Sequence, residues 1–225
     1  MNKTKYVIYL VCLLAVFVSP FGKSEAASKK AVEVKVEQKA VTKLSPILIY
    51  DEDKLLEITI EEAGKYHGDI CVCLTIAFRA TQFAISQLWR DEIPRRRDFK
   101  IVSALPTPGS KDAFEFITRV ITRKKGEDFK LKMPKGTNIK NISKDNFTFT
   151  FIRKSSNEQI KILVKGTVFP EGYFELRKRV KFNIPIPATP DEVRTFKQTK
   201  QKLRDSLLYF WTVNKIFDFE IVPLR

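Results

Sequence analysis

Histidine and cysteine are scarce in this chain, with one histidine and three cysteines among 225 residues. A single imidazole excludes chemistry that needs two histidines acting together. Three cysteines are too few for a framework of several disulfides. Glycine is also rare, with eight residues, and no serine-hydrolase elbow, phosphate loop or dinucleotide-binding fingerprint is present. These absences exclude the common signatures of several large enzyme classes.

Long hydrophobic runs are missing as well. The longest apolar run, residues 6–18, is shorter than the ~20 residues that a helix needs to span a bilayer. Two lysines precede it, and the small residues Ser24 and Ala26 follow at the positions that a signal peptidase reads. We therefore expect residues 1–26 to be a signal peptide and the mature protein to be exported, periplasmic or secreted, without a stable transmembrane span. An uncleaved membrane anchor is the alternative.

The remaining composition favours one folded domain. Hydrophobic residues make up 44% of the chain and include 18 phenylalanines, which is enough for a packed core. Residues 27–45 mix Lys, Glu, Val and Ala without glycine or aromatic residues, and we expect a solvated tether there. Residues 46–225 are expected to form a single α+β domain.

The charge balance is strongly basic. Loss of the three lysines and one glutamate of residues 1–26 would lower the formal net charge from +15 to +13. Such a field can attract nucleic acid, anionic lipid or acidic partners. No recognition-helix or RNA-binding signature accompanies the charges, so we expect no nucleic-acid partner.

Periodicity and capping patterns predict the main elements. Thr59 and Glu62 have the spacing of a capping box that opens a short helix ending near Gly68. Thr189 and Glu192 repeat that spacing before a longer helix. The fold class that these patterns predict is α+β, an antiparallel sheet packed with two or three main helices. The longer helices are expected at residues 69–89, 111–122 and 190–211, and the strands at residues 46–50, 100–104, 129–133, 147–151, 159–169 and 217–222.

The helix expected at residues 69–89 sets the predicted architecture. Its apolar positions recur at steps of three, four and seven, so one stripe should pack on the sheet. We expect the loop at residues 106–110 to lie beside the start of this helix, with His67 and Thr107 on the rim of a shared pocket. The predicted stripe consists of Cys71, Leu74, Phe78, Ile85 and Leu88.

One short segment, residues 66–73, contains the only histidine and the last two cysteines. Imidazole and thiolate are ligands that zinc and related transition metals prefer. His67 and Cys71 are four residues apart at a predicted helix-to-helix junction, where they can converge. Cys71 and Cys73 could be two ligands, one ligand and one packing residue, or a redox-sensitive pair, and the sequence leaves these alternatives open.

The same segment resembles the FmdE family, which is named after formylmethanofuran dehydrogenase. That family has a helix-start motif of the form His-Gly-His, any residue, Cys-Pro-Gly, followed by a small residue and an arginine. The corresponding segment here is His67-Gly68-Asp69-Ile70-Cys71-Val72-Cys73, and Ala77 and Arg79 follow. The resemblance extends over about residues 55–125. It implies an α+β core that is often dimeric, hence a homodimer.

The resemblance also implies metal ligands. His67 and Cys71 correspond directly to the family motif, whereas Asp69 and Cys73 replace its second histidine and its glycine. Members commonly have a further cysteine where this chain has Gly109. The implied cofactor is Zn²⁺ or another divalent transition metal, held in an open site by two or three protein ligands.

A second group of residues could bind a small anionic ligand. Thr107, Gly109 and Ser110 precede the helix at residues 111–122, where amide groups favour an anion; a plain helix cap formed by Ser110 is the alternative. Arg79 could complete an anionic pocket, or it could pair with Asp112.

The leading hypothesis from the sequence is an exported protein that binds a transition metal or a small anionic ligand around His67, Cys71 and Thr107. The alternative is a metal-free binding or interaction module that uses the basic, Phe-rich second half of the chain. The sequence names neither a substrate nor a reaction.

Overall fold

The structure is a computed structural model that describes residues 44–223. The predicted signal peptide at residues 1–26 and nearly all of the predicted tether at residues 27–45 lie outside the described residues. Within residues 44–223, no helix has both the length and the apolar character needed to cross a membrane.

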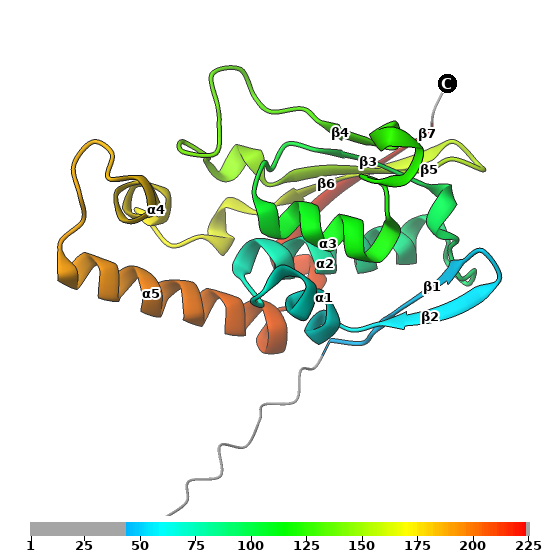
Figure 1. The fold of residues 1–225 in the computed structure, drawn as a ribbon, viewed down its shortest axis with the longest axis horizontal. Helices are drawn as coiled ribbons and strands as arrows, with labels where there is room; N and C mark the ends of the chain where they lie inside the picture. Colours follow the sequence, from blue (N-terminus) through cyan, green and yellow to red (C-terminus); the bar gives the residue numbers. More distant parts are fainter. Residues whose placement is uncertain (1–43, 224–225) are drawn as a thin grey trace, which may run out of the picture. The chain divides into compact units, whose positions relative to one another are not determined.

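The larger sheet has five strands in the order β4-β3-β5-β6-β7 (Figure 1). Phe149 and Phe151 of β5 are buried on one face, while Thr148 and Thr150 alternate with them on the other. The α+β class is confirmed. All pairs are antiparallel except β3 with β4, which run parallel. The strands are β3 (Phe99–Ser103), β4 (Phe129–Leu131), β5 (Thr148–Arg153), β6 (Glu158–Val164) and β7 (Phe217–Pro223).

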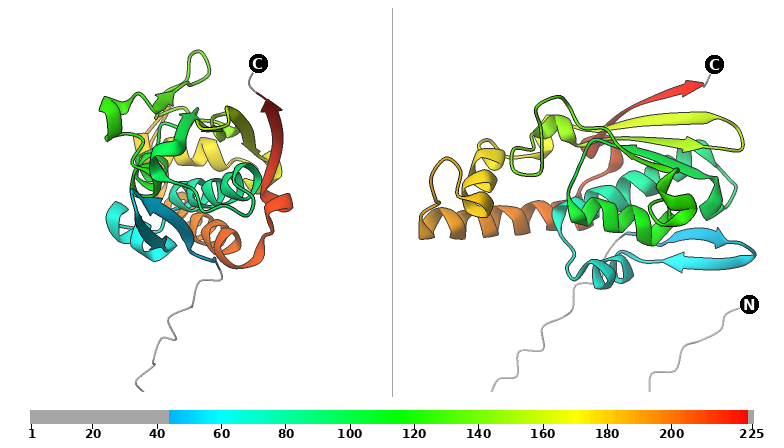
Figure 2. Two further views of the ribbon diagram at one scale, coloured as in Figure 1. Left: turned by 90° about the vertical axis from the view of Figure 1, so that its right-hand side faces the viewer. Right: turned by 45° about the horizontal axis from the view of Figure 1, so that its top comes forward.

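Two helices, α2 (Val72–Leu88) and α3 (Pro108–Thr118), cover one face of this sheet (Figures 1 and 2). Phe114 of α3 makes edge-on contacts with Phe149 and Phe151, at centroid separations of 5.5 and 5.8 Å. The prediction of a single buried stripe on α2 was too narrow. Because α2 contacts the sheet, α1, α3 and α5, most of its first three turns is buried on every side.

The segment before α2 contains a short hairpin and helix α1 (Ile60–His67). The predicted capping box is present: the Glu62 amide donates to Thr59 Oγ1, and the Thr59 amide donates to the Glu62 carboxylate. Gly68 ends α1 with a φ of 96°, a conformation that glycine adopts without a steric penalty. The hairpin pairs β1 (Ile47–Asp51) with β2 (Lys54–Ile58); the sequence predicted only the first of these strands.

The second half adds helices that the sequence predicted incompletely. Helix α4 (Tyr173–Phe182) was not predicted. Helix α5 (Pro190–Asp205) begins at the predicted capping box of Thr189 and Glu192, then continues as a π-helical turn, Ser206–Phe210. The remaining helices are α6 (Val213–Ile216) and the short 3-10 turns Arg96–Asp98, Arg123–Gly126, Lys144–Asn146 and Gly166–Val168.

Candidate functional site

His67 and Cys71 meet where α1 ends and α2 begins. Gly68 reverses the chain after His67, and Cys71 then becomes the N-cap residue of α2. The His67 Nε2 atom lies 3.6 Å from the Cys71 Sγ atom. The predicted convergence of these two side chains is therefore confirmed, although α2 begins at Val72 rather than at Asp69.

Asp112 of α3 positions the His67 ring. Its Oδ2 atom lies 2.6 Å from His67 Nδ1, and the His67 side chain is 18% exposed. A carboxylate at this distance favours the proton on Nδ1, which leaves the lone pair of Nε2 facing the Cys71 thiol. Asp112, His67 and Cys71 are thus connected in series through the two nitrogens of the His67 ring.

Gly109 leaves the space that this arrangement needs. A Cβ atom at position 109 would lie 2.6 Å from Cys71 Sγ and 3.2 Å from His67 Nε2. Gly109 lies in the first turn of α3 and has ordinary helical backbone. The glycine is required here for a close approach between α3 and the start of α2.

The two cysteines are both free thiols, but their surroundings differ. Cys71 Sγ accepts a hydrogen bond from the Leu74 amide at 3.4 Å, as an N-cap residue does. Burial raises the pKa of Cys73 to about 11, and the neighbouring Cys71 thiol contributes to the rise. Cys73 is therefore a protonated thiol near neutral pH, whereas Cys71 faces a potential proton acceptor.

Both thiols line a pocket with a volume of about 480 Å³. One side of it, which we call the motif wall, comes from α1, α2 and the start of α3. The opposite side, the cationic wall, comes from α4 and α5 and consists of Arg177, Lys181 and Lys200. His67 and Thr107 both line this pocket, so the prediction that they share one pocket is confirmed. The motif wall consists of His67, Asp69, Cys71, Cys73, Thr107 and Gly109.

Arg177 is the most buried cation of the pocket, at 7% exposed. Its Nη1 atom donates to the Ile139 carbonyl at 3.1 Å, and its guanidinium lies 5.3 Å from the centroid of the Phe182 ring. Burial lowers the pKa of Arg177, and no carboxylate of residues 44–223 offsets this. None of the three cations of this wall was predicted from the sequence. They lie in basic segments, residues 177–181 and 197–204, and nothing in the local sequence distinguishes them from exposed cations.

Two predicted ligand residues lie elsewhere. The buried Arg79 guanidinium donates to the Leu207 carbonyl in the π-helical turn, so it pairs neither with Asp112 nor with the pocket. Ser110 is fully buried and donates to the Thr107 carbonyl at 2.9 Å. Thr107, not Ser110, is the N-cap residue of α3, because Pro108 takes the first helical position.

The donor set around His67 and Cys71 is incomplete for the predicted metal. The 3.6 Å between His67 Nε2 and Cys71 Sγ is close to the roughly 3.5 Å expected for two ligands of a tetrahedral zinc ion. A zinc site needs at least three protein ligands. Within the described part of the chain, no group of three or more His, Cys, Asp or Glu residues is placed to hold a metal ion. The residues present do not fit a zinc site, and metal binding stays a prediction.

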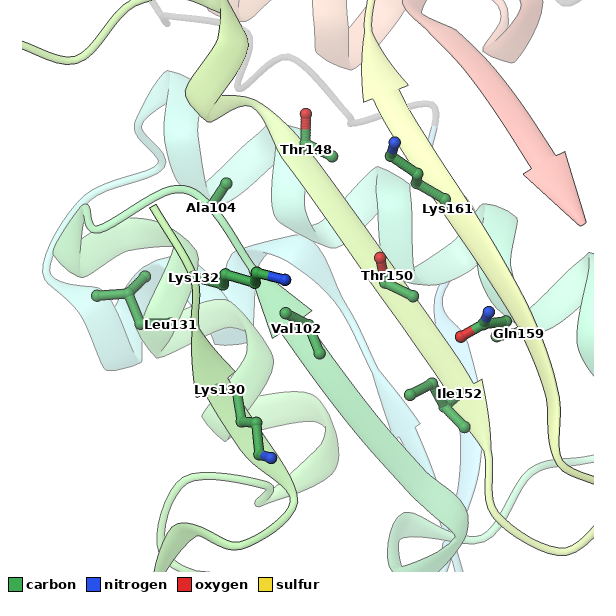
Figure 3. A pocket seen from close by; sticks show the side chains of 10 residues that line it. All are labelled: Val102, Ala104, Lys130, Leu131, Lys132, Thr148, Thr150, Ile152, Gln159 and Lys161. Atoms are coloured by element: carbon green, nitrogen blue, oxygen red, sulfur yellow. The ribbon is translucent and has the colours of Figure 1, made fainter. Parts of the chain in front are cut away.

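A second hollow, of about 790 Å³, lies on the open face of the sheet. Figure 3 shows Thr148 and Thr150 of β5 on this face, together with Lys130 of β4, Lys132 just after β4 and Lys161 of β6. Its lining contains no histidine, cysteine or carboxylate. The hollow therefore offers a basic surface for binding and no imidazole, carboxylate or thiol group.

Comparisons with known proteins place the chain in a family. Residues 66–214 match the family model described as FmdE, molybdenum formylmethanofuran dehydrogenase operon. No curated protein matched the chain. A crystal structure of a tungsten formylmethanofuran dehydrogenase FmdE-like protein from Syntrophus aciditrophicus aligns with a TM-score of 0.40 and 12% identity, over 74% of this chain and 71% of that one. The family match includes both walls of the pocket and well over half of the sequence, and the chain belongs to the FmdE family.

Proposed function

We propose that this protein binds a small organic anion in the pocket between the motif wall and the cationic wall. The observation that carries the proposal is Arg177, a buried guanidinium that lines the pocket and has a backbone carbonyl but no carboxylate as partner among residues 44–223. A buried charge without a counter-ion is destabilising unless something compensates it. A carboxylate or phosphate group in the pocket would supply that compensation and could bind the planar guanidinium through two hydrogen bonds.

Lys181 and Lys200 extend the positive charge along the same wall. A volume of about 480 Å³ falls within the range of small-molecule sites. Thr107 adds a hydroxyl group on the opposite wall. The proposed ligand is therefore a small molecule with at least one carboxylate or phosphate group, bound with its remainder towards His67 and Cys71.

Thermal unfolding tests the proposal. Inorganic phosphate, acetate and succinate would each be titrated into the full chain, because a ligand that binds only the folded state raises the melting temperature. We expect at least one of these anions to raise the melting temperature of the wild type and to have little effect on Arg177→Gln. Lys200→Gln should reduce the shift, whereas its neighbour Lys197→Gln is the matched control, since Lys197 is exposed and does not line the pocket.

A shift of equal size in Arg177→Gln and in the wild type would contradict the proposal. No shift with any of the three anions would favour the alternative function, an interaction module that uses the basic, Phe-rich second half. The lysines on the open sheet face are the surface that this alternative would use (Figure 3).

Metal binding is tested on protein purified without affinity tags or chelators. Stoichiometric zinc in the wild type, lost in Cys71→Ser and kept in Cys73→Ala, would establish His67 and Cys71 as metal ligands. Because no third ligand accompanies them in the described residues, we expect substoichiometric metal in the wild type.

We further propose that the protein acts outside the cytoplasm, on the support of the signal-peptide pattern in residues 1–26. Intact-mass analysis of the secreted protein is expected to show a chain that begins at Ala27. A full-length mass in the membrane fraction would instead support an anchor. The homodimer implied by the family resemblance is tested by the molar mass in solution.

A further inference from the structure

We propose that Cys71 is a nucleophile and that His67 is its general base. The substrate is an ester or thioester whose acyl group carries a separate negatively charged group, and that charged group is the anion bound in the pocket. The inference rests on the proposed anion site and adds a reaction to it. The residues that carry it are Cys71, His67 and Asp112, together with the space left by Gly109.

The geometry supplies each part that a thiol nucleophile needs. His67 Nε2 faces Cys71 Sγ at 3.6 Å, and Asp112 is bonded to the opposite nitrogen of the same ring at 2.6 Å. Asp112 is a positioning residue in this scheme, because it holds the ring orientation and has no contact with the thiol. Gly109 keeps the space beside the sulfur free of side-chain atoms.

The helix starts favour the negative charge that develops during acyl transfer. Cys71 is the N-cap residue of α2, and Gly109 lies in the first turn of α3. Amide groups in the first turn of a helix have no acceptor within the helix, and the helix dipole stabilises nearby negative charge. The sulfur therefore lies beside two such helix starts, which can stabilise a thiolate and a carbonyl oxygen bearing negative charge.

The proposed step is an acyl transfer without a change of oxidation state. The Cys71 thiol transfers its proton to His67 Nε2, and the sulfur attacks the carbonyl carbon of the substrate. A C–S bond forms, the bond from that carbon to the leaving oxygen or sulfur breaks, and the leaving group takes the proton from His67. Water then cleaves the acyl-Cys71 thioester and releases the acid, with its negatively charged group held by the cationic wall.

The first test compares alkylation of the two thiols in the full chain by site-resolved peptide mass analysis. Iodoacetamide is neutral and iodoacetate is an anion of similar size. We expect Cys71 to react at least ~10-fold faster than Cys73 with both reagents, and His67→Gln to slow the reaction of Cys71 by a factor of ~10². Arg177→Gln should slow iodoacetate more than it slows iodoacetamide, because only the anion binds the cationic wall.

The second test uses the monoester of 4-nitrophenol with glutaric acid. We expect a burst of 4-nitrophenolate equal to the number of chains and an acyl adduct on Cys71, both absent in Cys71→Ser. Asp112→Asn should slow the burst but keep the anion-induced rise in melting temperature, and Asp112→Glu should restore part of the rate. Circular dichroism of each variant tests whether a loss of folding causes the change in burst rate.

The two hypotheses fail differently. An iodoacetate preference that depends on Arg177, with no acyl adduct on Cys71, would overturn the nucleophile and leave the anion site. An adduct on Cys71 with no dependence on Arg177 would overturn the anion site instead. Alkylation of Cys71 only after treatment with a chelator would show a bound metal and would overturn the nucleophile.

Discussion

The two walls of the pocket differ in charge and in how they are held. The motif wall has the His67 imidazole, two thiols, the Asp69 carboxylate and the Thr107 hydroxyl group, and hydrogen bonds join His67 of α1 to the start of α2 and to α3. The cationic wall has a guanidinium and two ammonium groups on α4 and α5, and Arg179 and Glu192 link these helices by an ion pair. The groups able to react are thus fixed within a close-packed junction, and the groups able to attract a ligand stand on separate helices.

The two walls also differ in how closely their side chains are packed. The close contact of Gly109 with Cys71 and His67 leaves no room for a side chain at position 109 on the motif wall. Lys181 and Lys200 can adapt to anions of different size, because lysine side chains are long and flexible. In the proposed function, the cationic wall selects the ligand and the motif wall supplies the groups that react with it.

The largest effect is expected for Phe78→Ala. Phe78 is fully buried in α2, which carries Cys71 and also contacts α5. Removal of a buried phenylalanine ring costs about 3–5 kcal/mol of unfolding free energy. Urea denaturation measures the loss, and both anion binding and Cys71 labelling should weaken together. Leu55→Ala is the control, because Leu55 is 47% exposed and its loss should change stability by less than about 0.5 kcal/mol.

An intermediate effect is expected for Gly109→Ala, which disturbs the motif wall alone. The added Cβ would lie 2.6 Å from Cys71 Sγ, so α3 and α2 must move apart at a cost of about 1–3 kcal/mol. Cys71 alkylation should change, while the effect of Arg177→Gln on anion binding should persist. Gly166→Ala is the matched control, because its nearest contact is the flexible Lys144 side chain at 3.4 Å. Equal stability of the two alanine variants would contradict the close packing at Gly109.

The smallest effect is expected for Glu192→Gln, which disturbs the cationic wall alone. Hydrogen bonds from Thr189 hold the pKa of Glu192 below its ordinary value, and the ion pair with Arg179 adds to this. A carboxylate whose pKa is lower in the folded state than in the unfolded state stabilises the fold at neutral pH. This stabilisation decreases as the pH falls below the unfolded-state pKa of about 4.3, and it is lost once the pH is below the folded-state pKa as well. Glu192→Gln should therefore lower the urea midpoint at pH ~7 and match the wild type at pH ~2.

Asp191→Asn serves as the control for Glu192→Gln. The Asp191 side chain is 88% exposed and pairs only with Arg194 on the same helix, so its replacement should leave the urea midpoint unchanged. If the urea midpoints of Glu192→Gln and the wild type differ by the same amount at both pH values, the carboxylate charge is not the cause of the difference.

Much of the motif wall could be predicted because its determinants are local. The capping box of Thr59 and Glu62 sets the start of α1, and Gly68 sets its end, so His67 and Cys71 must converge across a turn of three residues. The pairing of Asp112 with His67 could not be predicted, because it depends on how α3 packs against α1. The same limit explains Arg79, whose partner at Leu207 is 128 positions away.

The sequence by itself determined the caps of α1 and α5 and the His67–Cys71 junction, since each depends on residues within about one helical turn. It also determined the α+β class through the periodicity of its helices and strands, and the family resemblance through one short motif. Only the tertiary structure decided that α4 and α5 bring Arg177, Lys181 and Lys200 opposite that junction. A basic helix has the same sequence pattern whether it faces solvent or a pocket. What distinguishes Arg177 is its burial, and burial depends on packing between segments about 100 residues apart.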